Sequence, residues 1–265
     1  MSIAYQSKSK PSASRGLAKA SAGHDATCAA RSETSAPGFE SAGWYQHVSV
    51  AAMDFRWSNE DLLRRSATDF TGNLRYAWDG ARPLLIGEVP LPKDVENPIA
   101  VAEQRMRVLL TRCAATGPAP DDEQLATLIA ESGLSFERRE RGWVLPTQLR
   151  IPETTISAGI GGIQVESVLV QGDPFSEVSR DALALFCCRA HRVHRFVRFV
   201  MSESDVRVIS QADSNWLEID FPASVDAVLS AAIRFRGAVT ALRLPELARA
   251  YLAVYARATA DPFEV

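Results

Sequence analysis

The sequence predicts an α+β fold in which antiparallel sheets are flanked by helices. Strand-like segments follow one another in runs instead of alternating strictly with helices, which favours antiparallel over parallel pairing. The segment Gly-Pro-Ala-Pro at 117–120 divides the chain, and helix and strand signals occur on both sides of it. We therefore expect two tandem modules, a reduced one over residues 39–117 and a complete one over residues 121–265.

The composition is that of a globular protein and excludes several other classes. Of the 265 residues, 46% are hydrophobic and 23% are charged, which excludes collagen-like, disulfide-rich and wholly disordered chains. No apolar run is long enough for a transmembrane helix, and the N-terminus lacks the apolar core of a secretory signal. With four cysteines and no Cys-x-x-Cys, we expect free thiols in a reducing, cytoplasmic compartment.

Residues 1–38 form a basic tail rich in serine and alanine. They carry five bases against two acids, a charge of +3, whereas the whole chain carries −3, so the rest of the chain carries −6. A low apolar content without a helix or strand period predicts disorder. A flexible tail and a targeting or transfer signal both fit this composition. The near-neutral overall charge argues against a protein that holds nucleic acid by electrostatics alone.

The first module is predicted to contain three strands and two helices. Ser58 begins a helix, because a polar cap is followed by acids in the first turn. Asp79-Gly80 marks a turn between two strands. Pro98 opens a further helix that ends near Gly117. The predicted strands cover residues 47–55, 74–78 and 83–89.

The second module repeats this order more fully. Acidic residues start a helix at Asp121, and Gly133 ends it. Glycine-rich residues 159–162 form a hairpin turn or a bulge between strand-like segments. The next helix is capped by either Ser176 or Ser179 and runs to about His194. The predicted strands cover residues 135–144, 163–170, 196–200, 206–209 and 216–221, of which the third and fourth form a hairpin.

The end of the chain is predicted to be a strand followed by helix. Residues 216–221 alternate apolar and acidic side chains, the pattern of a strand with one buried and one solvated face. The acidic members, Glu218 and Asp220, are expected on the solvated side. Ser224 then caps a long helix. Residues 244–255 either extend that helix or form a separate one.

Several phrases of the second module carry a resemblance to a known family. They are Leu-Ile-Ala-Glu-Ser-Gly-Leu at 128–134, Glu-Arg-Gly-Trp-Val at 140–144, the strand at 163–170, the helix at 181–188, the hairpin at 196–209 and the strand at 216–222 with its following helix. This order resembles the YbjN / type III secretion chaperone-like family, with the full module at about 121–258 and a partial copy at about 45–116. The resemblance implies small bacterial α+β modules that are not enzymes and that pair with other polypeptides, often as dimers, through a sheet face and a helix.

The helix that ends near His194 carries the sharpest cluster of reactive side chains. Cys187, His191 and His194 follow helical spacing and could meet at one metal ion, which would make the chain a metal-dependent enzyme. Most of this helix stripe is apolar, with His191 at its rim, so we favour Cys187 as a small core residue. We predict no metal, no cofactor and no catalytic residues, because no phosphate-binding loop, dinucleotide fingerprint or nucleophile motif occurs.

Two groups of arginines are expected on solvated faces, not on a nucleic-acid surface. In the first, acids alternate with the bases, and the second spans a helix end, where cations complement the helix dipole. We therefore expect no nucleic-acid partner. The first group is Arg138, Arg139 and Arg141, and the second is Arg189, Arg192, Arg195 and Arg198.

The leading hypothesis is a non-enzymatic protein-binding module. It would hold an extended segment of a partner polypeptide by edge-strand addition and apolar pockets. Aromatic residues of the second module are the candidate partner-binding residues: Trp143, Phe196, Phe199 and Trp216. The alternative is a structural or assembly subunit that forms a homodimer or a larger complex. No membrane partner is expected in either case.

Overall fold

The computed structural model describes residues 38–41, 45–51, 58–68, 72–78, 83–111, 117–140, 142–147 and 152–255. Residues 1–37 of the predicted tail lie outside the described residues. Its last residue, Gly38, begins the first strand. No described helix is long and apolar enough to cross a membrane.

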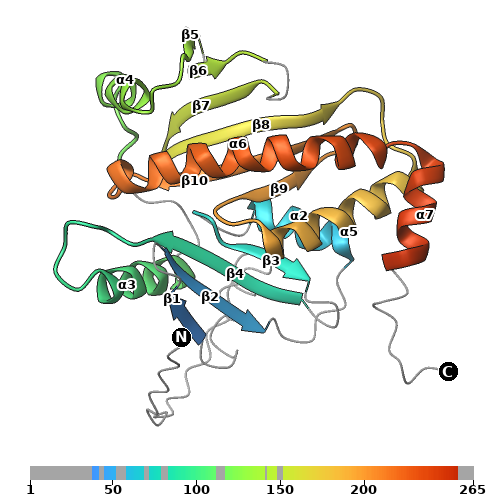
Figure 1. Ribbon diagram of the computed structural model, residues 1–265, viewed down its shortest axis with the longest axis horizontal. Coiled ribbons are helices and arrows are strands. Elements are labelled where there is room, and N and C mark those ends of the chain that lie inside the picture. Colours follow the sequence, from blue (N-terminus) through green and yellow to red (C-terminus); the bar gives the residue numbers. More distant parts are fainter. Residues whose placement is uncertain are drawn as a thin grey trace, which may run out of the picture.

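Two antiparallel sheets flanked by helices make up the described structure, which confirms the predicted α+β class (Figure 1). The first sheet has the strand order β1-β2-β4-β3, and the second has the order β5-β6-β7-β8-β10-β9. The strands of the first sheet are β1 (Gly38–Ser41), β2 (Tyr45–Ala51), β3 (Arg75–Trp78) and β4 (Pro83–Pro90). Those of the second are β5 (Glu137–Arg139), β6 (Gly142–Leu145), β7 (Thr154–Gly159), β8 (Gly162–Gln171), β9 (Arg198–Met201) and β10 (Asp205–Asp213).

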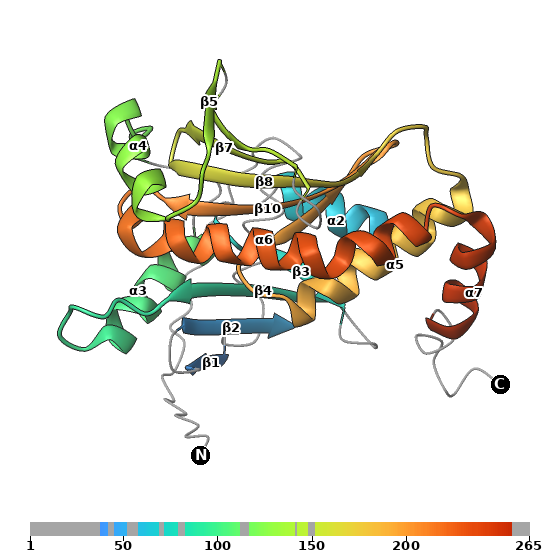
Figure 2. The same ribbon diagram turned by 45° about the horizontal axis from the view of Figure 1, so that its top comes forward.

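The helices cover the sheets and join the two halves. They are α2 (Asn59–Thr68), α3 (Pro98–Thr111), α4 (Asp122–Glu131), α5 (Glu177–Val193), α6 (Leu217–Ala241) and α7 (Pro245–Tyr255). The longest, α6, packs along β8 and β10 (Figure 2). Most buried apolar side chains of the two halves belong to a single cluster, which includes Leu62 and Met106 from the first half and Leu183 and Phe221 from the second.

The four strands of the first sheet correspond in order to the last four of the second sheet. The order β1-β2-β4-β3 matches β7-β8-β10-β9, and in each set one helix, α2 or α5, connects the second strand to the third in the chain. The register matches as well: Arg75 pairs with Ile86, and Arg198 pairs with Ile209, each 123 residues further along. The second half adds α4, β5 and β6 before this common arrangement.

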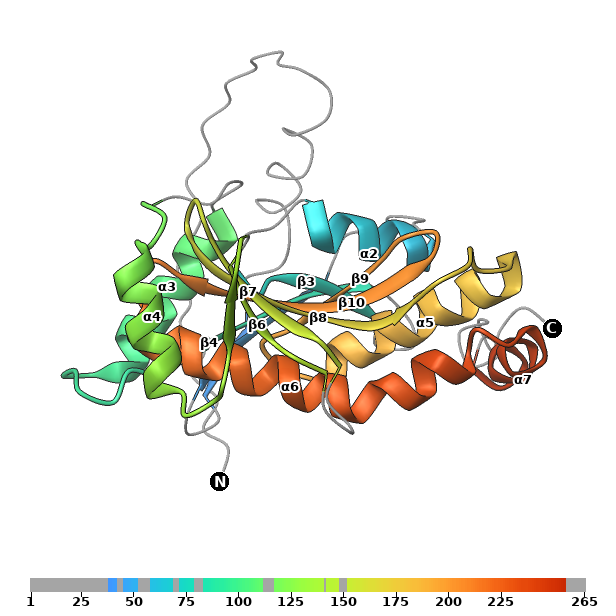
Figure 3. The ribbon, with the colours of Figure 1, turned by 90° about the horizontal axis from the view of Figure 1, so that it is seen from above.

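The two halves meet through α2 and α5, which lie side by side (Figure 3). Helix α2 also packs against β9, and α5 packs against β3, so the contacts are reciprocal. The side chains repeat this exchange. Arg75 of β3 donates to the carbonyl oxygen of His191 in α5 at 3.0 Å, and Arg198 of β9 donates to that of Ser66 in α2 at 3.1 Å. In each half, therefore, a strand arginine donates to a backbone carbonyl near the C-terminal end of a helix in the other half.

The strand predicted over residues 216–221 is wrong, because these residues form the start of α6. Leu217 and Phe221 are both buried and four residues apart, which fits a helix as well as the alternation fits a strand. Asp220 is also buried, not solvated, and its Oδ2 accepts from Arg105 at 2.6 Å. Ser224 is no cap: it lies inside α6, buried, and its hydroxyl is hydrogen-bonded to that of Ser210 at 3.0 Å.

Other local predictions are confirmed or refined. The Asp121 side chain caps α4 by accepting from the backbone nitrogen of Gln124, and Ser176 caps α5, which resolves the choice between Ser176 and Ser179. The segment 244–255 contains a separate helix, α7. The predicted strand over 135–144 is a hairpin of two strands, β5 and β6, and the prediction missed β7 altogether.

Candidate functional site

Strand β5 forms an open edge of the second sheet. Its three residues, Glu137, Arg138 and Arg139, are all exposed, and β6 is its one partner among the described strands. The β5–β6 hairpin lies at the end of the molecule remote from the first sheet (Figures 1 and 2). An exposed edge strand offers unpaired backbone groups to another chain.

The register of the hairpin identifies the free backbone groups. Arg139 pairs with Gly142 across a two-residue connection, so this pair exchanges the hairpin's hydrogen bonds. The neighbouring pair, Arg138 with Trp143, is then the non-hydrogen-bonded type. The backbone N–H and C=O of Arg138 therefore point away from β6, toward the open side of the sheet.

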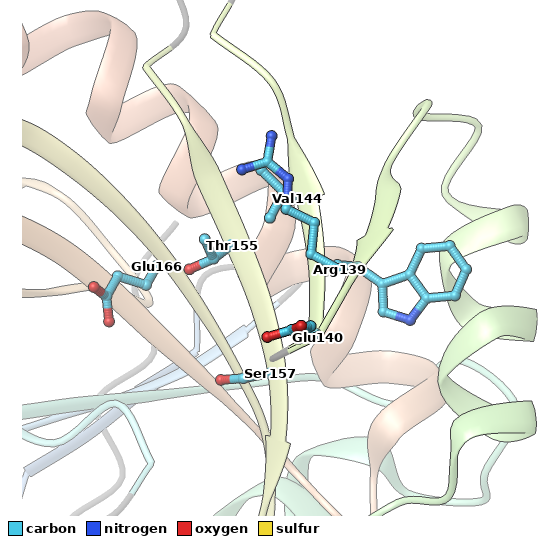
Figure 4. A pocket seen from close by; sticks show the side chains of 8 residues that line it. Arg139, Glu140, Val144, Thr155, Ser157 and Glu166 are labelled. Carbon is cyan, nitrogen blue, oxygen red and sulfur yellow. The ribbon is translucent and has the colours of Figure 1, made fainter.

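A groove of about 940 Å³ lies beside this edge, on one face of the sheet. The pairing of Val144 with Thr155, and of Thr155 with Glu166, brings these three side chains to the same face. Figure 4 shows that the lining comes from the β5–β6 hairpin, β7 and β8. The lining residues are Arg139, Glu140, Gly142, Trp143, Val144, Thr155, Ser157 and Glu166.

Among the described residues around the groove, carboxylates outnumber guanidinium groups. Arg139 lies between Glu137 and Glu153, with nitrogen–oxygen distances of 3.8 and 3.6 Å. Glu166 is paired with Arg207, 2.9 Å away, but Arg207 also pairs with Asp205. Glu140 adds a further carboxylate to the lining. The described residues therefore give the groove an acidic surplus, which attracts positively charged groups.

The opposite face of the hairpin is covered by α4. Arg138 pairs with Asp122 of α4 at 2.5 Å, and its guanidinium lies 5.6 Å from the ring centre of Trp143. The apolar side of α4, with Leu125, Leu128 and Ile129, is buried. Helix α4 thus supports the hairpin from one face, and the other face carries the groove.

The four aromatic residues predicted to bind a partner do not come together. Trp143 is half-buried and borders the groove, but its ring lies against Arg138 on the α4 side of the hairpin. Phe196 and Phe199 are buried in the core, so they present no surface to a partner, and the prediction is wrong for both. Trp216 is half-buried at the start of α6, where Arg105 stacks 4.5 Å from its ring centre. The aromatic pattern could not separate core from surface, because both kinds of position occur in strands.

Cys187, His191 and His194 do not converge on a metal site. His191 is fully buried instead of lying at a rim, and both of its ring nitrogens are occupied by backbone groups of Tyr76 and Phe199. Cys187 is also buried, and burial raises the pKa of its thiol. His194 contacts the carbonyl oxygen of Ala227 through Nε2. Across the described ranges, no three His, Cys, Asp or Glu side chains are placed to hold a metal ion.

Some of the arginines predicted on solvated faces are buried or stacked on aromatic rings. Arg198 is buried, which corrects its placement on an open face. Arg189 stacks on Tyr255 and Arg195 on Tyr45, with 4.5 and 4.2 Å from each guanidinium carbon to the ring centre. These contacts hold the bases against the protein's own aromatic rings.

The groove contains residues that the sequence analysis missed. Thr155 and Ser157 lie on β7, and Glu166 lies on β8. The signal was present: in Thr-Thr-Ile-Ser, after Pro152, a buried Ile156 alternates with polar neighbours, as in a half-buried strand. No protein-family model, no curated protein and no solved structure matches the chain.

Proposed function

We propose that this chain is a non-enzymatic protein-binding module, similar to bacterial secretion chaperones, that holds an extended segment of a partner polypeptide. The partner segment would add to the second sheet as a strand beside β5. The observation that carries this proposal is the exposed edge of β5, with the backbone groups of Arg138 unpaired by β6, next to a groove that can receive side chains. Strand addition uses both features, since main-chain bonds give affinity and side-chain pockets give specificity.

The proposal includes two tandem modules that act as a fused pair. The matching strand orders, the shared spacing of 123 residues and the reciprocal contacts of α2 and α5 support it. In such a pair the surfaces that a homodimer would use are already in contact within one chain. The added strands β5 and β6 then make the second sheet the longer one and give it a distinct edge.

The acidic surplus around the groove indicates the chemistry of the partner. A strand beside β5 would direct alternate side chains to the face that carries Glu140 and Glu166. Lysine or arginine at those positions would be favoured by the surrounding carboxylates. The expected partner segment is therefore extended and basic, with β-branched residues and no proline at its centre.

Selection from a library of displayed peptides on the full chain tests this function. We expect enriched peptides with bases at alternate positions, whose binding weakens as salt is added. Glu140→Gln should weaken a selected peptide by about twofold to fivefold, the range of an exposed ion pair. Glu246→Gln, the same change at an exposed position on α7, should leave binding unchanged. A selection that returns no saturable binder, or only acidic ones, would contradict the proposal.

A further inference from the structure

A second pocket, of about 510 Å³, lies between the two halves of the chain. It forms where α3 meets β10 and the start of α6, which lie close together in Figures 1 and 2. None of its lining residues belongs to the groove beside β5. Its volume falls within the range of about 300–1,000 Å³ that is typical of small-molecule sites.

Two side-chain amides on one wall have NH₂ groups left for a ligand. The Oδ1 of Asn73 accepts from the backbone nitrogen of Gln211 and from the hydroxyl of Ser210, each at 3.1 Å. The Oε1 of Gln211 accepts from the backbone nitrogen of Gly72 at 3.0 Å. Neither amide nitrogen bonds to another described residue. Because the oxygens are occupied, the two amides can donate to a carboxylate or a carbonyl oxygen.

Acidic groups on the same pocket exceed the basic ones. The Arg105 guanidinium donates to Oδ2 of Asp220 at 2.6 Å and to the carbonyl oxygen of Pro90 at 3.3 Å. The Oδ1 of Asp220 is buried and accepts no hydrogen bond within the described residues. Within the described residues, the carboxylate of Asp213 accepts side-chain hydrogen bonds only from Asn215, a neutral residue. Glu88 also lines the pocket, but Arg75 balances its charge. The pocket therefore has one carboxylate more than Arg105 and Arg75 can balance, which favours a cationic group.

The α3 side of the pocket carries an aliphatic surface beside Gln104 and Arg105. This surface is formed by Val101, Val108 and Leu109 of α3. One cavity is thus bordered by three kinds of surface. The amides can donate to an anionic group, the surplus carboxylate can pair with a cationic group, and the aliphatic residues can contact an apolar group. The simplest small molecule that presents all three complementary parts is an amino acid.

We propose that this pocket binds an aliphatic α-amino acid. The ammonium group pairs with Asp213, the carboxylate accepts from Asn73 and Gln211, and the side chain packs against α3. The ligand contacts residues from both halves and so stabilises their junction. This site is independent of the groove and goes beyond the protein-binding function.

Titration calorimetry of the full chain with three probes tests the assignment. The probes are L-leucine, 3-methylbutylamine, which lacks the carboxylate, and 4-methylpentanoate, which lacks the ammonium group. We expect L-leucine to bind at least about tenfold more tightly than either analogue, because each analogue loses a charge-assisted hydrogen bond. No saturable binding of L-leucine, or equal binding of all three probes, would overturn the proposal.

A variant then assigns the ammonium position. Asp213→Asn keeps the shape of the side chain and should weaken L-leucine by at least about tenfold, with 4-methylpentanoate unaffected. Asp226→Asn, the same charge change on an exposed position of α6, serves as the control and should bind L-leucine like the parent chain. Equal loss of both ligands in Asp213→Asn, with an unchanged melting temperature, would overturn the assigned role of Asp213.

Discussion

The imidazole of His191 joins an edge strand of each sheet. Its Nδ1 lies 2.6 Å from the carbonyl oxygen of Tyr76 in β3, and its Nε2 lies 2.6 Å from the backbone nitrogen of Phe199 in β9. A carbonyl oxygen only accepts, so Nδ1 carries the proton and Nε2 accepts from Phe199. Burial, together with the charge of Arg75, lowers the pKa of His191 to about 3. A neutral histidine therefore connects the two halves.

Replacing His191 by alanine should destabilise the fold by about 3 kcal/mol or more. The change leaves the carbonyl of Tyr76 and the N–H of Phe199 buried without partners, at about 1–3 kcal/mol each. His191→Asn should cost less, because its amide nitrogen can still donate near the position of Nδ1. Urea unfolding of the three chains measures these differences. A loss below about 1 kcal/mol for His191→Ala would show that the imidazole does not connect the sheets.

Stability should fall with pH between 6.5 and 4.5 because of His191. Its pKa is about 3 in the folded chain and near the ordinary 6.5 in the unfolded chain, so the unfolded state binds more protons in this window. The free energy of unfolding then falls as pH falls, by up to about 1.4 kcal/mol per pH unit from this group. Unfolding curves at several pH values measure the slope. His191→Asn should have a shallower slope, and an identical slope in both chains would contradict the assignment.

Glu88→Gln should be among the most destabilising single changes in the first sheet. Glu88 and Arg75 form a buried pair with distances of 2.5 and 2.8 Å. Burial opposes ionisation of Glu88, but Arg75 and His47 together outweigh it and lower the pKa to about 2. Removing the carboxylate leaves the Arg75 charge buried, at about 3–5 kcal/mol. Glu60→Gln breaks an exposed pair with Arg180 and should cost less than about 1 kcal/mol in the same unfolding assay; equal losses would contradict this ranking.

Gly87→Ala should destabilise the contact between β4 and α3. An added Cβ would lie 2.4 Å from Cδ2 of Leu74 and 3.1 Å from Sδ of Met106, and both side chains are fully buried. Overpacking of this kind costs about 1–3 kcal/mol. Gly237→Ala in α6 meets no atom within 4 Å and should instead stabilise by up to about 1 kcal/mol. Thermal unfolding distinguishes the two, and equal shifts would exclude close packing at Gly87.

Local sequence signals predicted elements whose determinants are also local. The caps at Asp121 and Ser176 and the β9–β10 hairpin are of this kind, since each depends on neighbouring residues. For Asp220, the local signal predicted the wrong environment. Its alternation with apolar residues indicated a solvated strand position, but its partner is Arg105, 115 residues away. Nothing within 216–221 carries information about that partner.

The junction between the halves could not be predicted for the same reason. The helical pattern placed His191 at the rim of an apolar stripe. Its buried position depends on two partners in other elements, Tyr76 of β3 and Phe199 of β9, which the pattern of α5 does not include. In the groove, the sequence supplied Trp143 but not β7, whose polar residues lie on the same face as Val144. A short strand between two turns gives few residues for a periodic pattern.

The proposed partner strand pairs with the open side of β5 at Arg138. Comparing how tightly one selected peptide binds to Arg138→Pro and to Arg138→Ala tests this pairing. Proline removes the backbone N–H that points away from β6, and an edge position tolerates this change. Alanine keeps the N–H and removes the same side-chain contacts with Asp122 and Trp143.

We expect Arg138→Pro to bind the peptide about tenfold more weakly than Arg138→Ala does, the value of one hydrogen bond left unmade. Arg138→Ala should stay close to the parent chain, and both variants should keep its melting temperature within a few degrees. Equal affinities of the proline and alanine variants for the peptide would contradict strand addition at β5.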